Sequence, residues 1–124
     1  MLKDKDSAAI VAVKDIAAAR SFYVDTLGLT PLQNSNDMLV LKTGATQLVV
    51  YVSDYAGTNK ANAAVWGVGD EIEAITAALR DKGVRFEHYP DMPGDYRDGI
   101  HSNGDFKAAW LKDPDGNILH LNNM

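Results

Sequence analysis

The sequence reads KAAWLKDPDGNILHL at residues 107–121, and this stretch predicts two strands joined by a tight turn. In the turn, Pro114 presets its own backbone φ angle, and Gly116 tolerates the positive φ that tight turns require. Apolar residues flank the turn on both sides. We therefore expect the chain to close with a β-hairpin whose second strand carries His120.

The earlier part of the chain contains one pattern twice. An apolar run at 8–13 and a helix-capping Asp15 precede a helical stripe that ends at Gly28. Asp70 and Gly83 repeat Asp15 and Gly28 at the same offset of 55 residues. Two unrelated strand–helix units are the alternative, because Asp begins and Gly ends many helices. We favour a duplication, because several positions share a single offset.

Each copy predicts a module of the order β-α-β-β-β, and the two modules cover residues 7–53 and 62–123. The stretch 54–61 is polar and contains glycine, so it predicts a linker. Two such modules placed side by side form one curved mixed sheet around a cavity, with the helices outside. We therefore expect a single α+β domain over residues 1–124, with a cavity of the kind that binds small ligands.

In the second module, the pattern predicts that Asp70 caps the helix. A strand is expected at 84–88, followed by a loop rich in Pro, Gly and Asp at 88–105. Within this loop, the segment 95–101 combines Arg97 with an aromatic residue and an imidazole. That composition predicts either a mobile lid over a ligand or a solvated connector.

Composition and charge exclude several classes of protein. The chain has 124 residues and no Cys, so disulfides, thiol nucleophiles and thiolate metal sites are impossible. Its net charge of −5 and scattered Lys and Arg residues argue against nucleic acid as a partner, because phosphate binding needs a clustered positive surface. No apolar run is long enough for a membrane span, and residues 1–6 lack the apolar core of a signal peptide. We expect a cytoplasmic protein without a membrane partner.

Short motifs spread over nearly the whole chain accompany the repeat. They are VKD at 13–15, RSFY at 20–23, LG at 27–28 and KDPDGN at 112–117. In these motifs the chain resembles the vicinal oxygen chelate superfamily, which includes glyoxalases, bleomycin-resistance proteins and extradiol dioxygenases. A narrower likeness, to small glyoxalase-like proteins of unassigned activity, lies in AGTN at 56–59, FEHY at 86–89, MPG at 92–94 and KAAW at 107–110.

The resemblance also implies where metal enzymes of this superfamily place their metal ligands. Up to four strands contribute one ligand each, and in this sequence those positions hold Ala8, Val49 or Val50, Ala63 and His120. Three of the four positions lack a donor atom, whereas a divalent ion needs at least three protein ligands. We therefore expect no metal and no cofactor. The alternative is a relocated metal site made from His88, His101 and His120, although their spacing fits no recognised ligand pattern.

The candidate ligand-binding residues are aromatic, imidazole and cationic side chains of the predicted sheet and loop. They are Tyr51, Trp66, Arg97, His101, Trp110 and His120. Aromatic residues on sheets usually belong to the core, but in this architecture one sheet face lines the cavity. His120 is also the candidate general acid or base, with an ordinary pKa of about 6.5. We favour the alternative, a cavity-lining or solvated His at a strand end, because the sequence identifies no partner carboxylate.

Three functions follow from the resemblance. We favour a protein that binds a planar or amphipathic small molecule without a metal, as resistance members of the superfamily do. The alternative is a glyoxalase-like lyase or related enzyme that uses His120 for acid–base catalysis or a relocated metal. The third is a module whose sheet serves mainly as a dimer interface. We expect a homodimer, and whether the protein catalyses a reaction stays open.

Overall fold

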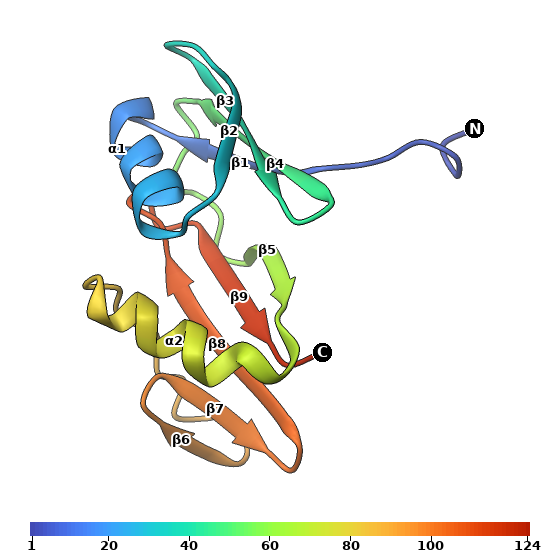
Figure 1. Cartoon of the computed structure of the whole chain (residues 1–124). Helices are drawn as coiled ribbons and strands as arrows, with labels where there is room; N and C mark the ends of the chain where they lie inside the picture. Colours follow the sequence, from blue (N-terminus) through green and yellow to red (C-terminus); the bar gives the residue numbers. More distant parts are fainter.

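The computed structural model describes residues 1–124, whose strands form two sheets, one in each half of the molecule (Figure 1). The first sheet has the strand order β1-β4-β3-β2, with β1 parallel to β4 and the other neighbours antiparallel. Its strands are β1 (Ala9–Val13), β2 (Thr30–Asn34), β3 (Met38–Thr43) and β4 (Thr46–Val52). Between β1 and β2, helix α1 (Ile16–Arg20) continues directly into η1, a π-helix at Ser21–Thr26.

The second sheet has the strand order β5-β9-β8-β7-β6, with β5 parallel to β9 and the other neighbours antiparallel. Its strands are β5 (Asn62–Gly67), β6 (Asp95–Arg97), β7 (Ile100–Asn103), β8 (Phe106–Lys112) and β9 (Ile118–Asn122). After β5, the 3₁₀ turn η2 (Gly69–Glu71) leads into helix α2 (Ile72–Asp81). The hairpin predicted at the end of the chain is therefore confirmed as β8 and β9.

The two helices begin differently, although the sequence predicts the same cap for both. The Asp15 side chain accepts hydrogen bonds from the backbone N–H groups of Ala17 and Ala18, so Asp15 caps α1 as predicted. The matching prediction for Asp70 is wrong. Gly69 has a φ of +57° and starts η2, so Asp70 already lies inside a helical turn and no side chain caps α2.

The α+β class and the tandem arrangement of modules are confirmed, but the strands form two sheets instead of one continuous sheet. The edge strands β1 and β5 lie next to each other without forming a ladder. Side chains of the β8–β9 turn explain this break, because Asn117 Nδ2 donates to the Ala12 carbonyl at 2.8 Å. The Lys14 N–H donates to Asp115 Oδ2 at 3.2 Å. These backbone groups of β1 and of the residue that follows it are therefore not available to a neighbouring strand.

The segment predicted as a strand at 84–88 also differs from the expectation. It forms only an isolated bridge, in which Phe86 pairs with Leu111 of β8. The rest of this edge of β8 is taken by β7, where His101 pairs with Ala108. The predicted loop at 88–105 thus contains the β6–β7 hairpin.

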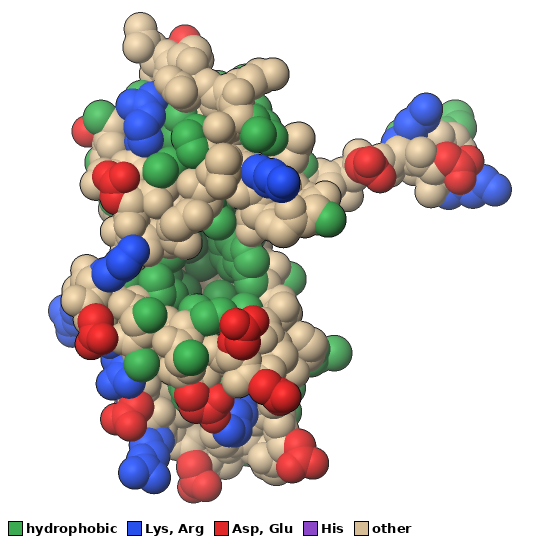
Figure 2. Space-filling view, viewed as in Figure 1, with side chains coloured by type: hydrophobic (Ala, Val, Ile, Leu, Met, Phe, Trp, Pro, Cys, Tyr) green, Lys and Arg blue, Asp and Glu red, His purple; other side chains and the backbone are tan.

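Both modules contribute to one hydrophobic core, which lies between the helices and one face of each sheet. Tyr23 and Leu41 from the first half belong to the same buried cluster as Leu111 and Leu119 from the second half. The halves meet around a hollow of hydrophobic side chains, which Figure 2 shows between them.

Two hydrogen bonds between side chains also join the halves. The Tyr23 hydroxyl of η1 donates to Asp113 Oδ2 of the β8–β9 turn at 2.7 Å. Burial and the Asp113 carboxylate raise the pKa of Tyr23, so the hydroxyl keeps its proton and acts as a donor. At the end of β3, Thr43 Oγ1 accepts a hydrogen bond from Trp66 Nε1 of β5 at 2.8 Å. The first half thus binds the β8–β9 turn of the second half, and the second half binds the end of β3, beside the β3–β4 turn.

Candidate functional site

The sheet faces that point away from α1 and α2 expose large apolar side chains, and we call them together the helix-free face. Its exposed members include Ile10, Met38, Tyr51 and Val65, of which Ile10 is 59% and Val65 is 61% exposed. Their alternate neighbours Val11 and Val50 are buried against the helices. Clustered exposed apolar side chains of this kind mark sites of ligand or protein binding.

On the second sheet, the helix-free face carries a row of rings. Val65, His120 and Trp110 occupy paired positions on β5, β9 and β8. The rings of Trp110 and His120 are stacked, with centroids 4.6 Å apart and planes 21° from parallel. Stacking of flat rings at this separation forms a rigid, largely apolar wall.

The β6–β7 hairpin extends this wall. His101 of β7 contacts Trp110 edge-on, with centroids 5.2 Å apart, and Tyr96 of β6 contacts His101 at 4.7 Å. His88 stacks on Tyr96 at 4.0 Å, and Tyr89 packs against the edge of Trp110 at 5.4 Å. The prediction of a loop at 88–105 does not anticipate these contacts: it considers His88 only for a relocated metal site and Tyr96 only as part of a lid, and it gives Tyr89 no role in the site. Asp98-Gly99, a frequent hairpin-turn pair, was the available signal.

The hydrogen bonds of the wall define the proton positions on the buried imidazole of His101 and the half-buried imidazole of His120. His101 Nε2 accepts a hydrogen bond from the Tyr89 N–H at 3.0 Å, so its proton lies on Nδ1. Asn122 Oδ1 accepts from the Met124 N–H at 3.1 Å, which leaves Asn122 Nδ2 to donate to His120 Nε2 at 3.2 Å. His120 therefore carries its proton on Nδ1 as well. Both Nδ1 atoms are buried without a hydrogen-bond partner.

Burial lowers the pKa of both imidazoles, because desolvation disfavours the charged form. The neighbouring His88 adds to this effect at His101, whereas the Ala109 backbone partly opposes it at His120. Near neutral pH both rings are uncharged. The wall can therefore stack against a flat ligand without charge repulsion from its own imidazoles.

This arrangement predicts a pH dependence of stability. We expect the free energy of unfolding to fall as the pH decreases below about 6.5, because His in the unfolded chain then binds protons that His101 and His120 resist in the folded chain, where desolvation lowers the pKa of each. Urea unfolding at about pH 7.5 and about pH 5 measures the difference. The double variant His101→Gln, His120→Gln should lose most of the change between these two values, and an undiminished change would contradict the prediction.

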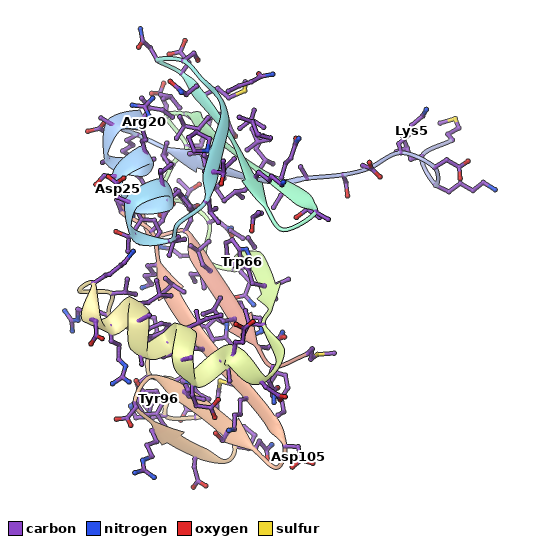
Figure 3. The ribbon with its side chains drawn as sticks, viewed as in Figure 1. Lys5, Arg20, Asp25, Trp66, Tyr96 and Asp105 are labelled. Carbon is purple, nitrogen blue, oxygen red and sulfur yellow. The ribbon has the colours of Figure 1, made fainter.

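The remaining candidate residues lie elsewhere. Tyr51 is on the helix-free face of the first sheet, beside a pocket that also contacts Ile10 and Ala63. Trp66 points to the opposite side of β5 and packs against the core at the junction of the halves, whereas Tyr96 lies at the far end of the second half (Figure 3). The Arg97 side chain is 91% exposed and lies beside Asp98. The structure thus groups His101, Trp110 and His120, with Tyr51 on the neighbouring sheet.

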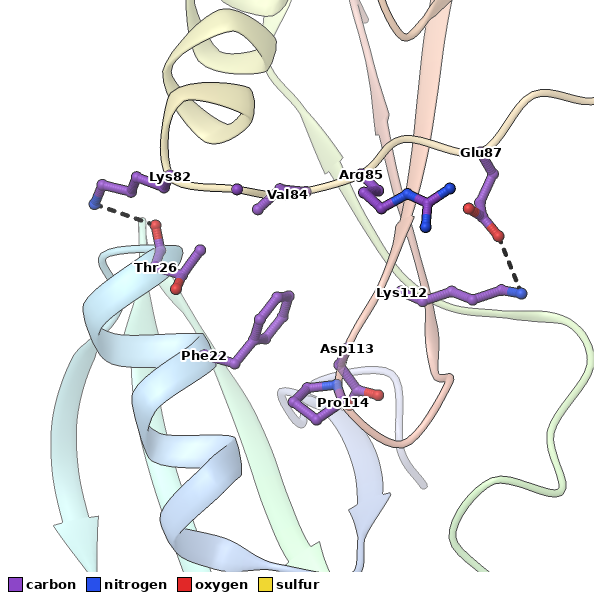
Figure 4. A pocket seen from close by; sticks show the side chains of 10 residues that line it. Phe22, Thr26, Lys82, Val84, Arg85, Glu87, Lys112, Asp113 and Pro114 are labelled. Carbon is purple, nitrogen blue, oxygen red and sulfur yellow. Dashed lines mark hydrogen bonds and ion pairs between the residues drawn. The ribbon is translucent and has the colours of Figure 1, made fainter.

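A polar cleft of about 550 Å³ lies on the joint between the two halves. Figure 4 shows partners of its charged groups: Lys82 Nζ donates to the Thr26 carbonyl, and Lys112 forms an ion pair with Glu87 at 3.0 Å. Lys82 thus links the two halves, and Lys112 and Glu87 are partners within the second half.

Comparison with known proteins agrees with this fold. The sequence model of the Glyoxalase/Bleomycin resistance protein/Dioxygenase superfamily matches residues 7–121. The chain belongs to this superfamily. Among curated protein sequences, none is significantly similar to the chain.

Solved structures of the glyoxalase/bleomycin resistance/dioxygenase superfamily share the fold at low sequence identity. A glyoxalase family protein from Enterococcus faecalis has a TM-score of 0.73 at 24% identity, over 98% of this chain and 99% of that one. The bleomycin-binding protein from Streptomyces verticillus, complexed with copper(II)-bleomycin, has a TM-score of 0.72 at 22% identity, over 98% and 97%. Lactoylglutathione lyase from Agrobacterium tumefaciens has a TM-score of 0.71 at 17% identity, over 98% and 95%.

The positions that the superfamily resemblance implies for metal ligands can be tested against this structure. Ala8, Val49 and Ala63 carry only hydrocarbon side chains, and His120 Nε2 is held by Asn122. No group of three or more His, Asp or Glu side chains in residues 1–124 is arranged to hold a metal ion. The residues of a single chain therefore do not fit a metal centre.

None of the helices has the length and apolar character that crossing a membrane requires.

Proposed function

We propose that this member of the superfamily binds a planar or amphipathic small molecule on its helix-free face, without a metal ion. The observation that carries the proposal is the wall formed by the stacked rings of Trp110 and His120, which His101 and Tyr96 extend. Flat aromatic rings offer large contact areas to flat ligands at a small cost in conformational entropy. The apolar side chains exposed on the neighbouring sheet offer further surface for the apolar part of such a ligand.

A solved relative supports binding of small molecules by this fold, because the Streptomyces verticillus protein is a bleomycin-binding protein in complex with copper(II)-bleomycin. The lactoylglutathione lyase shares the fold equally well, so fold alone does not choose between binding and catalysis. The site supports binding, because Nδ1 of His120 is buried and Nε2 is engaged by Asn122. Neither nitrogen is placed to exchange a proton with a ligand.

The proposal that ligand binding needs no metal ion has a direct test. We expect the thermal midpoint to stay unchanged when Ni²⁺, Zn²⁺ or Mn²⁺ is added, because an ion stabilises a protein only if it binds the native state. Differential scanning fluorimetry with and without each ion measures this, with EDTA-treated protein as the reference. A rise of several degrees that His120→Ala removes would replace the proposal with a metal-dependent function.

We also propose a cytoplasmic homodimer. The exposed apolar side chains of Ile10, Met38 and Val65 support this assembly, because a second chain placed along the helix-free face would cover them and deepen the ligand site. The mass in solution, measured by light scattering, would show a single chain of 13.5 kDa if this assembly does not form.

A further inference from the structure

The hollow between the two halves, shown in Figure 2, lies on the helix side of the sheets. It has a volume of about 190 Å³, and eight of its nine lining residues are hydrophobic. The lining comes from the chain after η1 at Leu27 and Leu29, from β5 at Trp66, and from α2 at Ile75 and Leu79. We call this hollow the junction pocket.

The size of the junction pocket limits its occupant. An engineered apolar cavity of about 150 Å³ in another protein stays dry and binds benzene or xenon. A pocket of about 190 Å³ therefore accepts one six-membered ring with a small substituent. Drug-sized ligands occupy pockets of about 300 Å³ or more, so the junction pocket is too small to enclose one.

The one polar residue of the lining adds a chemical requirement. Thr43 Oγ1 already accepts a hydrogen bond from Trp66 Nε1, which satisfies the indole N–H. The hydroxyl hydrogen of Thr43 has no acceptor among the hydrogen bonds of the chain, so it is free to donate. A ligand with a single acceptor oxygen complements this donor, whereas a charged ligand would lose its hydration without gaining a partner.

We propose that the junction pocket binds a compact neutral ring compound with one acceptor oxygen, such as an aryl ketone, whose oxygen accepts from Thr43. This site is separate from the helix-free face, because Trp66 and Val65 are consecutive residues of β5 and point to opposite faces of the sheet. If no ligand binds in the junction pocket, the proposed binding on the helix-free face is therefore not contradicted, and the reverse also holds. Trp66 reports on the junction pocket and Trp110 reports on the helix-free face.

Two isosteric probes test the proposal, acetophenone and α-methylstyrene, which differ only by a carbonyl oxygen in place of a methylene group. Titration of the ¹⁵N-labelled protein with each probe should shift the indole N–H resonance of Trp66. A shift of the Trp110 resonance would report separate binding of the flat probe on the helix-free face. Acetophenone should bind about threefold to tenfold more tightly than α-methylstyrene, which is the range that one neutral hydrogen bond supplies. If Trp66 does not shift, or if only Trp110 shifts, the proposal is overturned.

Three variants locate the bound probe. Ile75→Phe fills the pocket from α2 and should abolish the Trp66 shift, whereas Val65→Phe adds the same ring on the opposite face and should leave it intact. In a Trp66→Phe background, which removes the indole N–H that Thr43→Val would otherwise leave unpaired, Thr43→Val should make the two probes bind equally, as followed at the Leu79 methyl resonances. In the same background Thr43→Ser, which keeps the hydroxyl, should keep the preference for acetophenone. Binding that Ile75→Phe does not reduce, or a preference that survives in Thr43→Val, would overturn the assignment.

Discussion

Replacing Asp113 by Ala is expected to lower the free energy of unfolding by about 3–5 kcal/mol. The Asp113 side chain is only 4% exposed and accepts four hydrogen bonds. The donors are the Tyr23 hydroxyl at 2.7 Å, Asn117 Nδ2 at 2.7 Å, the Asn117 N–H at 2.8 Å and the Asp115 N–H at 2.9 Å. Without the carboxylate, the fully buried Tyr23 hydroxyl loses its acceptor and the β8–β9 turn loses its internal support.

Urea unfolding followed by circular dichroism measures the effect, and two variants provide matched controls. Asp115→Ala removes a neighbouring carboxylate that makes one 3.2 Å hydrogen bond, to the Lys14 N–H, and should cost less than about 1 kcal/mol. Tyr23→Phe removes one donor but leaves Asp113 its other partners, so it should cost about 1–2 kcal/mol. A loss at Asp113→Ala no larger than that at Asp115→Ala would show that the buried network contributes little to stability.

Replacing Trp110 by Ala is expected to weaken the binding of a planar amphipathic probe by about tenfold to a hundredfold. Trp110 occupies the centre of the ring wall, where it touches His120, His101 and Tyr89. Its loss removes both the largest stacking surface and the support of the flanking rings. Fluorescence titration with 8-anilinonaphthalene-1-sulfonate measures the change, because this dye is flat and too large for the junction pocket.

The controls for Trp110 separate the site from general packing. Trp110→Phe keeps a ring in the wall and should retain most of the affinity. Trp66→Phe removes a ring of the same type from the opposite side of the sheet and should leave binding unchanged. Equal losses in Trp66→Phe and Trp110→Ala would place the dye outside the helix-free face, and circular dichroism of each variant confirms that it is folded.

Much of the architecture could be predicted from the sequence because its signals are local. The β8–β9 hairpin and the first helix follow from turn and cap residues that act within a few positions, such as Gly116 and Asp15. The β6–β7 hairpin is not predicted, because polar residues flank Asp98-Gly99 and hide the alternating pattern of a strand. In the structure both turn residues adopt the positive φ that this type of pair favours. The break between the sheets was not predictable, because it depends on side chains of the β8–β9 turn that reach across to Ala12 and Lys14.

For the candidate site as well, residue types could be predicted, whereas contacts between distant segments could not. His101, Trp110 and His120 could be predicted as candidates by residue type, and they lie together because their strands are neighbours. Their proton positions were not predictable, since these depend on the backbone N–H groups of Tyr89 and Met124. The Tyr23–Asp113 pair joins residues 90 positions apart, so no local pattern of the sequence indicates it.

The side chains that occupy the outer edge of β1 also affect how this protein behaves at high concentration. An uncovered strand edge can recruit a strand from another molecule, and repeated recruitment leads to fibrils. Asn117 and Asp115 hold the backbone groups of Ala12 and Lys14 that such a strand would need. The β8–β9 turn thereby also shields this edge of β1 against strand recruitment from another molecule.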